Sequence, residues 1–548
     1  MPVSSEDCQV LVVGAGPVGL FLAGELKRHG VTCRLIDKSN GPCNEARATQ
    51  FHPRSLEIFA QIGLFERFVQ QGIILEGTEI HHEGETVPIQ NLLKEVETPF
   101  PFDLSLPQSR TERILIDYLN ELDQPIEWNV ELVSLTQDTT GVNAILKHQD
   151  GEQEVFKIDY LVGCDGAHSQ VRHELGLKLK GRDYPSTFIV GDIRVKGALA
   201  RDRNTVISSS SSGMFFGPLP EDRFIFSCDI PEGGSPHSPG GQPTIEEVQT
   251  YVNAAGRSDL TLYDPVWLNY FQCHLRIAQH YQVGQVFLAG DAAHIQSPAA
   301  GQGMNTGIQD GFNLAWKLAL VLGTRSPRTL LESYNAERYT TGKEMLKLTA
   351  KIHESDFKHH TSLAEQTKEF IINYLVHHHL LHPRLSTADQ TRISYHHSPI
   401  VFEEPGEKTD DAWWHGPIAG DRAPDCSLIQ QPEAITIQLF DLWKTPQHHL
   451  LIFQGAGTQG DRSILWSRLA TITETYGELI QPHLIFQADI SNIRSADRYL
   501  YDQKGAAHRR YGVTHPSFYL IRPDGYIGYR SPSVDVQKLE TYLSRIFL

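Results

Sequence analysis

Short apolar runs that end in glycine or in an acid mark the start of the chain. Residues 9–13 (QVLVV) break into the glycine-rich stretch 14–19 (GAGPVG), and an apolar pattern resumes over residues 20–26. This order predicts a buried strand, a tight turn and the start of a helix. A second run, residues 32–36, ends at Asp37. We expect the two runs to be neighbouring strands of an α/β fold.

Two later runs carry acidic signals at their ends. Residues 160–163 (YLVG) lead through a cysteine to Asp165-Gly166 and then to a polar turn that opens a helix. Residues 286–289 (VFLA) lead to Gly290-Asp291, and a loop of small residues then feeds a long helical pattern that runs to Leu318. Such a loop presents backbone N–H groups and the positive end of the helix dipole to whatever lies in front of it.

Between these segments the pattern changes to that of a second sheet. Apolar runs at 187–195, 205–208, 213–219 and 223–228 read as successive strands of a mixed sheet. The serine run at 208–212 is short enough to be a hairpin turn, with local disorder as the alternative.

Composition limits the possible partners. The net charge is −18, from 48 basic and 66 acidic residues, and it is spread without a long acidic or basic tail. Nucleic acid is therefore not an expected partner. No basic segment precedes the first strand, and no run reaches the roughly 18 apolar residues of a membrane span. These features predict a soluble, cytoplasmic protein without a signal peptide.

The cysteines and histidines do not indicate a metal site. The seven cysteines are scattered, odd in number and without CxxC spacing, which argues against zinc and against a disulfide framework. The three adjacent histidines at 377–379 cannot converge from one helical face, so we expect them in a solvated helix or loop. No metal site and no catalytic triad are predicted.

The first glycine-rich stretch has the spacing of a dinucleotide fingerprint. Gly14 permits the turn, Gly16 lets the backbone approach a pyrophosphate, and Gly19 allows close packing of helix and strand. Asp37 follows at roughly the distance where an acid meets a ribose hydroxyl. A GxGxxG alone does not separate FAD from NAD(P).

The three motifs together resemble a known family. GxGxxG, Asp165-Gly166 and Gly290-Asp291 occur in the order found in single-component (class A) FAD-dependent aromatic hydroxylases, the phenol hydroxylase-like flavoprotein monooxygenases. The resemblance implies that Asp165 and Gly166 lie near the FAD pyrophosphate and the transient path of NADPH or NADH, and that Asp291 holds the ribityl chain. Taken alone, Asp165 reads better as a turn or helix-cap residue.

Further segments match the family's cofactor and substrate sites. Arg47 would bond phosphate or pyrimidine oxygens, Gln108 would touch FAD, and Pro298, Gly301 and Gly303 would form a loop facing the reactive ring. The residues that the resemblance places around FAD are Gly14, Gly16, Pro17, Gly19, Asp37, Lys38, Arg47, Gln108, Asp165, Gly166, Asp291, Pro298, Gly301, Gly303, Met304 and Asn305. Met214, Phe216, Phe226 and Pro298 are the substrate candidates; core packing is the alternative for the first three.

The resemblance also implies an architecture. It predicts an α/β fold with a Rossmann-like FAD-binding domain of glutathione-reductase type, an inserted mixed β-sheet substrate domain that roofs the flavin, and a C-terminal thioredoxin-like domain. In that last domain Gly455-Ala456-Gly457-Thr458 stands where a redox CxxC would be, so we expect a structural or dimerising role. The expected bounds are 1–78, 105–183 and 275–350 for FAD binding, 79–104 and 184–274 for substrate, 351–400 for a helical linker and 401–548 for the thioredoxin-like domain.

The implied activity is an NAD(P)H-dependent monooxygenation. Through a C4a-hydroperoxyflavin, one oxygen atom of O2 would enter a small aromatic substrate, phenolic or polyketide-like, with the flavin carrying the redox chemistry. Some relatives carry a phenol-deprotonating aspartate near Thr49, and its absence leaves the substrate base unassigned. A related FAD-dependent epoxidase, reductase or non-aromatic oxygenase is the alternative, with a flavin halogenase or a non-catalytic scaffold behind it. The sequence leaves open the substrate, the choice between NADH and NADPH, and whether the protein is a homodimer.

Overall fold

A computed structural model gives the fold. It describes residues 8–45, 48–82, 85–90, 92–208, 213–230, 241–296, 301–347, 390–406, 411–456, 462–487 and 498–548. The histidines at 377–379, the serines at 209–212, most of the expected linker at 351–400, and Gly457 and Thr458 lie outside these ranges. Across the described residues no helix is long and apolar enough to cross a membrane.

A six-stranded sheet carries the three sequence motifs. Its order is β18-β19-β12-β1-β2-β8, and β19, β12, β1, β2 and β8 run parallel. The strands are β1 (Val10–Val13), β2 (Cys33–Asp37), β8 (Ile126–Trp128), β12 (Tyr160–Gly163), β18 (Gln282–Val283) and β19 (Val286–Leu288). The fully buried apolar runs read from the sequence are β1, β12 and β19, as expected for a parallel sheet covered on both faces.

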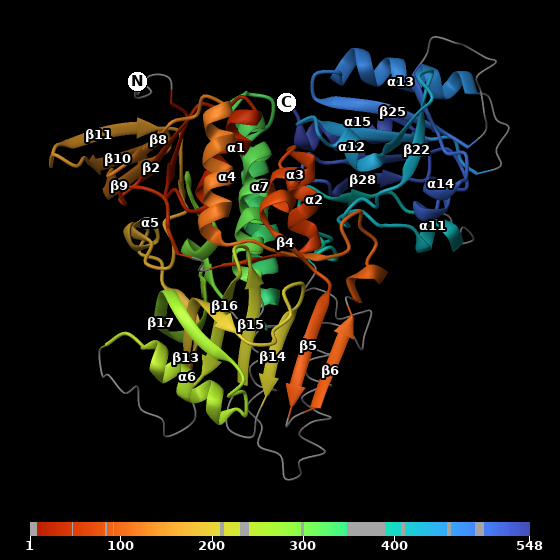
Figure 1. The fold of residues 1–548 in the computed structure, drawn as a ribbon. Helices are drawn as coiled ribbons and strands as arrows, with labels where there is room; N and C mark the ends of the chain where they lie inside the picture. Colours follow the sequence, from red (N-terminus) through yellow and green to blue (C-terminus); the bar gives the residue numbers. More distant parts are fainter. Residues whose placement is uncertain are drawn as a thin grey trace.

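Three long helices stand together beside this sheet (Figure 1). They are α1 (Pro17–Arg28), α4 (Gln108–Glu121) and α7 (Gln302–Leu322). Gly24 and Gly311 allow the close approach, because a Cβ at Gly24 would lie 2.9 Å from the ring of Tyr118 on α4, and one at Gly311 would lie 3.3 Å from Phe21 on α1. The neighbouring elements are α2 (Pro53–Gln61), α3 (Phe65–Gln71), α5 (Gln170–Glu174), the sheet of β3 (Gln50–Phe51), β7 (Asp103–Ser105) and β4 (Ile73–Leu75), and the sheet of β9 (Glu131–Asp138), β10 (Gly141–Lys147) and β11 (Gln153–Ile158).

A second, eight-stranded sheet lies below the first in Figure 1 and is called the roof sheet here. Its strands, in spatial order, are β20 (His294–Ile295), β17 (Thr261–Ala278), β13 (Leu179–Lys196), β16 (Arg223–Asp229), β15 (Gly213–Leu219), β14 (Asn204–Ser208), β5 (Gly77–His82) and β6 (Glu85–Gln90). The four strands expected from the apolar runs are all present in it. One face is covered by α6 (Ile245–Ala254), which packs on β17.

The third sheet belongs to the C-terminal part of the chain. Its order is β21-β28-β27-β24-β25-β26-β22-β23, with α13 (Arg462–Tyr476) and α15 (Val536–Ile546) packed beside it. The strands are β21 (Phe402–Glu403), β22 (Ser427–Gln431), β23 (Ile435–Gln438), β24 (His448–Phe453), β25 (Ile480–Phe486), β26 (Tyr499–Tyr501), β27 (Ser517–Ile521) and β28 (Ile527–Ser531), and the short helices are α11 (Asp411–His415), α12 (Leu439–Leu442) and α14 (Ala506–Arg510). The hairpin predicted at 522–526 joins β27 to β28, and Gly455 follows β24. The thioredoxin-type relationship of this unit stays a prediction.

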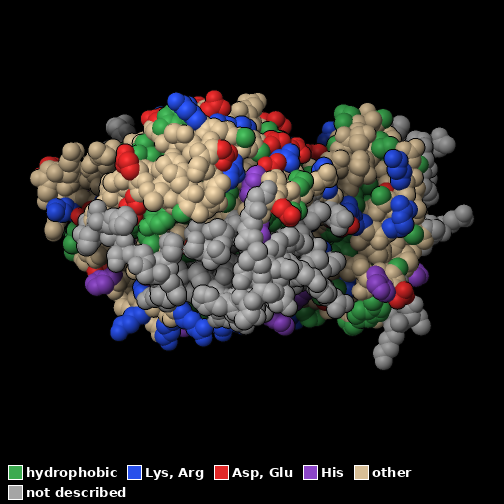
Figure 2. All heavy atoms as spheres, turned by 60° about the horizontal axis from the view of Figure 1, so that its bottom comes forward, with side chains coloured by type: hydrophobic (Ala, Val, Ile, Leu, Met, Phe, Trp, Pro, Cys, Tyr) green, Lys and Arg blue, Asp and Glu red, His purple; other side chains and the backbone are tan. Residues whose placement is uncertain are grey.

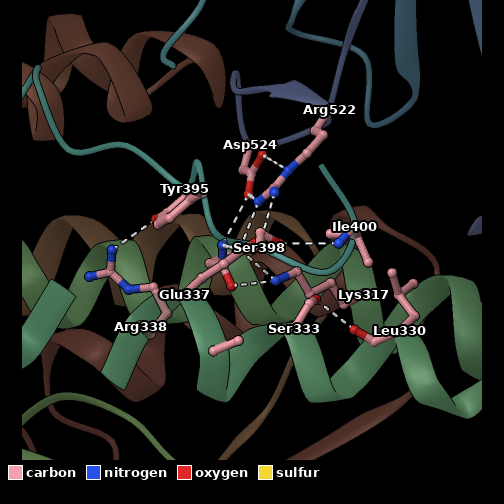
Figure 3. Close-up of polar contacts among 12 residues, drawn as sticks. Lys317, Leu330, Ser333, Glu337, Arg338, Tyr395, Ser398, Ile400, Arg522 and Asp524 are labelled. Atoms are coloured by element: carbon pink, nitrogen blue, oxygen red, sulfur yellow. Dashed lines mark hydrogen bonds and ion pairs between the residues drawn. The ribbon is translucent and has the colours of Figure 1, made fainter. Parts of the chain in front are cut away.

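A buried ion cluster fastens the C-terminal hairpin to the rest of the molecule. Glu337, in the π-helical turn Asn335–Tyr339, lies 2.8 Å from the Nζ atom of Lys317 on α7 and 2.7 Å from Arg522 in the hairpin. Arg522 also pairs with Asp524, which accepts a bond from the Nε1 atom of Trp316 on α7 at 3.1 Å. Figure 3 shows Glu337 between the lysine and the arginine.

These charges are stable inside the protein because each one is paired. Burial alone would raise the pKa of Glu337, but the charges of Arg522 and Lys317 hold it well below its usual value. Burial lowers the pKa of Lys317 to about 8, against the opposing effect of Glu337. The cluster therefore carries ionised groups at neutral pH, and each depends on its partners.

The backbone of the same hairpin is held from a second side. Arg54 donates to the carbonyl of Asp524 at 2.7 Å, and Gln61 donates to the carbonyl of Pro523 at 2.7 Å. Both donors are on α2. The C-terminal sheet is thus bonded to two helices of the first unit, α2 and α7.

The surface in Figure 2 is mixed in character. Basic side chains gather along the lower left rim of that view, and the hydrophobic side chains between the charged ones form small, separate patches. The described part of this face therefore presents no broad apolar area of the kind that marks a stable protein interface.

Removing Arg522 from the cluster should cost far more than removing an exposed arginine. Arg522→Met leaves Glu337 and Asp524 buried without their main partner, so we expect the free energy of unfolding to fall by about 3–5 kcal/mol. Urea denaturation followed by circular dichroism measures it. Arg67→Met is the matched control, because it removes an arginine from the exposed pair with Glu121 and should cost about 1 kcal/mol or less. Equal losses in the two variants would contradict the argument.

Candidate functional site

The three sequence motifs meet at one edge of the six-stranded sheet. They follow β1, β12 and β19, which are adjacent and parallel, so their carboxyl ends point the same way. The backbone joins them directly: Cys164 N–H donates to Val13 at 2.7 Å, and Ala289 N–H donates to Gly163 at 3.0 Å. The crevice outside the carboxyl ends of parallel strands is where α/β folds bind ligands.

The three fingerprint glycines have distinct roles. Gly14 has φ +104°, and a Cβ on it would lie 2.4 Å from the carbonyl oxygen of Cys164. A Cβ on Gly19 would lie 1.8 Å from the carbonyl oxygen of Gly14. Gly16 differs, because its Cβ would meet nothing within 4 Å. The first two glycines are required by the turn and the helix packing, whereas Gly16 leaves open space.

That open space lies in front of the N-terminus of α1. Gly16 is the N-cap residue, no side chain caps the helix, and Pro17 occupies the first turn. The N–H groups of this turn and the helix dipole favour an anion such as a pyrophosphate. The sequence prediction for Gly16 and Pro17 has a matching geometry here.

Asp37 braces the fingerprint loop. It ends β2, and its Oδ2 atom accepts the N–H of Ala15 at 2.7 Å while its Oδ1 atom accepts the N–H of Ser39 at 2.8 Å. The side chain is half-buried, and Lys38 beside it is exposed. A ribose contact at Asp37 stays a prediction.

Asp165 supports the start of the short helix α5, whose N-cap residue is Ser169. It accepts bonds from the hydroxyl of Ser169 at 2.5 Å and from the N–H of Val171 at 3.1 Å. Burial raises its pKa in spite of these bonds. Gly166 follows with φ +77°. Arg172 on α5 then bridges this loop to the next motif, since it donates to the carbonyl of Ala292 at 3.0 Å.

Asp291 follows β19 and is exposed to solvent. Protein atoms nevertheless surround its carboxylate closely enough that desolvation raises its pKa. A Cβ on Gly303, in the first turn of α7, would lie 4.0 Å from its Oδ1 atom. An exposed carboxylate beside a helix N-terminus suits a hydroxyl-rich ligand segment.

A buried carboxylate on α7 holds this motif in place, and sequence reasoning missed it. Asp310 accepts the N–H of Gly290 at 3.0 Å, lies 2.8 Å from the Nε2 atom of His294, and accepts the Nε–H of Arg338 at 2.7 Å. Burial would raise the pKa of Asp310, but Arg338 and His294 lower it overall. The available signal was an acid in the middle of the long helical pattern that follows Gly290-Asp291.

The first turn of α7 lies beside Asp291. Gly301 is its N-cap, with φ +60° and no side-chain cap, and Met304 is half-buried. Asn305 is fully buried instead, and its amide donates to the carbonyls of Gln50 and Gly301, each at 2.8 Å. The Asn305 side chain therefore fixes the loop from inside the protein.

Gln108 opens α4 next to the segment that follows Asp37. Its amide donates to Glu112 at 2.8 Å, and Glu112 accepts the N–H of Cys43 at 2.7 Å. Arg47 and Pro298, the other two FAD candidates of this region, lie outside the described residues. No cluster of metal-ligating side chains occurs in the part of the chain that the structure describes.

The residues present fit an extended dinucleotide. An acid at the end of β2, an uncapped helix end with free space at Gly16 after β1, and an exposed carboxylate at Asp291 after β19 follow one another along the edge of the sheet. This is the order in which FAD presents adenosine ribose, pyrophosphate and ribityl hydroxyls to a Rossmann-type fold.

Met214, Phe216 and Phe226 are not placed as the sequence prediction required. Their side chains are 0–2% exposed and pack in the closed core between the roof sheet and Val248 and Val252 of α6. The alternation of side chains along a strand shows which residues share a face. It does not show which of the two faces is covered by α6, which comes later in the chain. The face opposite α6 carries other apolar side chains, namely Val190, Phe215, Leu219, Ile225 and Trp267.

Comparisons with known proteins agree with this geometry. The family described as "FAD binding domain" matches residues 7–349. The 6-methylpretetramide 4-monooxygenase of Streptomyces rimosus is 38% identical over 64% of this chain and 62% of its own length, and pentachlorophenol 4-monooxygenase of Sphingobium chlorophenolicum is 30% identical over 97% and 95%. The solved flavin-dependent monooxygenase PieE, in complex with FAD and substrate, superposes with a TM-score of 0.80 at 21% identity over 98% of both chains, which is a likeness of fold.

A bulky side chain at Gly16 should abolish cofactor binding without unfolding the protein. The Cβ of Gly16→Val meets open space, so we expect the melting temperature of the cofactor-free protein to stay within about 2 °C of the parent. The valine would fill the place of the pyrophosphate, so flavin retention after gel filtration should be lost. A Gly16→Val protein that retains flavin like the parent would show that the site lies elsewhere.

Proposed function

The chain belongs to the family of flavoproteins that share the FAD binding domain, and from this premise we propose that it is an NAD(P)H-dependent monooxygenase that adds one oxygen atom of O2 to a hydroxylated aromatic substrate. Its class is that of the FAD-dependent monooxygenases related to phenol and polyketide hydroxylases. The finer features, which are the nicotinamide donor and the route of oxygen transfer, are part of the proposal.

One observation carries the proposal. The loops after β1, β12 and β19 lie together at the carboxyl edge of the sheet, where α1 begins without a side-chain cap and the first turn of α7, also without one, lies beside Asp291. Two uncapped helix ends at one site favour a ligand with negative charge at two points, which a dinucleotide with an anionic reduced ring provides.

When bound, FAD would supply the redox chemistry, accepting hydride from NAD(P)H and passing one oxygen atom from O2 to the substrate. The chain's own residues would bind and orient it. The first turn of α1 would hold the pyrophosphate, Asp37 the adenosine ribose and Asp291 the ribityl hydroxyls. Asp165 and Gly166 would border the pyrophosphate and the nicotinamide path.

Small residues at the start of α7 would face the reactive ring. Gly301 and Gly303 leave room beside it, and the N–H groups of the first turn would stabilise negative charge on the pyrimidine edge. The nicotinamide would visit the same ring and leave again.

The substrate would lie between this ring and the roof sheet. We place it against the face opposite α6, where Phe215, Ile225 and Trp267 are apolar and only Ile225 is fully buried. A partly open apolar face suits an aromatic ring. The relatives described above are named for pentachlorophenol and for 6-methylpretetramide, and experiment must establish the size of the ring system that this chain accepts.

Other flavin chemistry remains the competing function. A reductase would consume NAD(P)H without adding oxygen, and an epoxidase or non-aromatic oxygenase would add oxygen to a different class of carbon. A halogenase or a non-catalytic scaffold has less support, because the Gly290-Asp291 loop is intact and held by Asp310. Product mass separates these possibilities.

The proposed activity predicts coupled turnover with phenols. The purified protein should be yellow, should oxidise NADH or NADPH faster when a suitable phenol is added, and should yield a product heavier by one oxygen atom. Absorbance at the nicotinamide band and mass spectrometry with labelled O2 measure these outcomes. NAD(P)H consumption without labelled product would favour a reductase.

The two faces of β15 should respond differently to truncation. Phe216 is 0% exposed within the core against α6, so Phe216→Ala should lower the free energy of unfolding by about 3–5 kcal/mol. Its neighbour Phe215 is half-buried on the opposite face, so Phe215→Ala should cost less stability and raise KM for the substrate. Chemical denaturation and steady-state kinetics are the measurements. A larger KM effect at Phe216 than at Phe215 would reverse our assignment of the faces.

A further inference from the structure

The carboxylate of Asp103, on β7, lies on the side of the strand that faces the start of α7 and the roof sheet. Phe51 and Leu104 pair across β3 and β7 and are completely buried in the core. Because side chains alternate along strands, Gln50, Asp103 and Ser105 lie on the opposite face. Ser105 shows where that face points, since its hydroxyl donates to the carbonyl of Pro218 on roof strand β15 at 2.6 Å.

Asp103 is the accessible acid of this face. Its side chain is 22% exposed, and each oxygen already accepts one bond. His52 Nδ1 lies 2.8 Å from Oδ1, and the amide of Gln50 donates to Oδ2 at 2.9 Å. Each carboxylate oxygen keeps a second lone pair that these donors do not use.

The imidazole of His52 is held from its other side by α7. The amide nitrogen of Gln302 lies 3.2 Å from His52 Nε2, and Gln390 donates to the carbonyl oxygen of the same Gln302 side chain. With Gln302 donating to Nε2, the proton of a neutral His52 sits on Nδ1 and points to Asp103. The hydrogen bonds thus run in one direction, from Gln390 to Gln302, from Gln302 to His52, and from His52 to the carboxylate of Asp103.

This pair borders the loop that we place against the flavin ring. A Cβ on Gly301 would lie 3.3 Å from the Gln50 side chain and 3.5 Å from His52 Nε2. Asn305 locks the arrangement, since it accepts the N–H of His52 at 3.1 Å and donates to the carbonyl of Gly301 at 2.8 Å. Among the described residues, the ionisable group placed directly against Asp103 is His52.

We propose that Asp103 is the base that removes the proton from the hydroxyl group of the aromatic substrate, with His52 as its positioning residue. The inference rests on the proposed function and names the base that the sequence left unassigned. The O–H bond of the substrate breaks, the proton passes to a free lone pair of the Asp103 carboxylate, and the electron pair stays on the phenolate oxygen. The phenolate is the more electron-rich ring, as oxygen transfer requires.

Substrate acidity provides the first test. With Asp103→Asn we expect kcat/KM for unsubstituted phenol to fall about a hundredfold or more. With para-nitrophenol, assayed above its own ionisation, the same variant should stay within roughly a few-fold of the parent, because no proton remains to be removed. The residual phenol activity should rise with pH as more of the substrate ionises in solution.

Ser105→Ala is the matched control. It removes a polar group from the same face of the same strand but leaves the carboxylate, so any loss should be equal for the two substrates. His52→Leu should show part of the selective loss of phenol activity seen in Asp103→Asn. His52→Asn, whose amide nitrogen takes the place of Nδ1, should bring the activity back toward that of the parent. Equal losses for phenol and para-nitrophenol in Asp103→Asn would assign a structural role and overturn the proposal.

A binding measurement is independent of turnover. In resting, FAD-loaded enzyme without NAD(P)H, the absorbance of bound para-nitrophenol reports its ionisation. A carboxylate against the phenolic oxygen opposes a second negative charge, so Asp103→Asn should move this ionisation to lower pH by about one unit. An unchanged titration would show that Asp103 does not touch the hydroxyl. A parent enzyme that oxygenates no phenol would instead refute the proposed function itself.

Discussion

The pairing of buried charges along α7 is the constraint on which the site depends. Asp310 binds the backbone of Gly290, the ring of His294 and the guanidinium of Arg338, all inside the protein. About two turns further along α7, Lys317 pairs with Glu337. Moving α7 would break these contacts and leave a buried charge without its partner. The contacts therefore fix the position of the helix, and with it the position of its uncapped end beside Asp291.

The parts of the fold that depend on local pattern could be predicted from the sequence. The strands β1, β12 and β19 are short apolar runs bounded by glycine and aspartate, a pattern that favours a buried strand. The three motifs that follow these strands occur in the order found in the family, and this resemblance indicated a shared FAD site. The simpler alternative for Asp165 was a turn or helix cap; its carboxylate accepts an N–H of the first turn of α5, while Ser169 is the N-cap residue. This contact does not conflict with a place beside the cofactor.

The parts that depend on distant partners could not be predicted. The substrate candidates on β15 and β16 alternate as expected, but only the position of α6 decides which face is closed, and α6 follows them in the chain. His52 and Asp103 lie 51 residues apart and meet only because β3 pairs with β7. A histidine before a helix and an acid in a short strand do not by themselves predict that the two side chains are in contact.

The ion pair of Glu337 and Arg522 has a consequence for how the protein is made. Its partners are separated by 185 residues, so a nascent chain that has just released Glu337 from the ribosome contains Lys317 but not yet Arg522. The buried cluster is therefore completed only after the later segment has been translated. A truncated messenger would yield a first half in which Glu337 keeps one of its two cationic partners, and such a less stable form is more open to quality-control proteases.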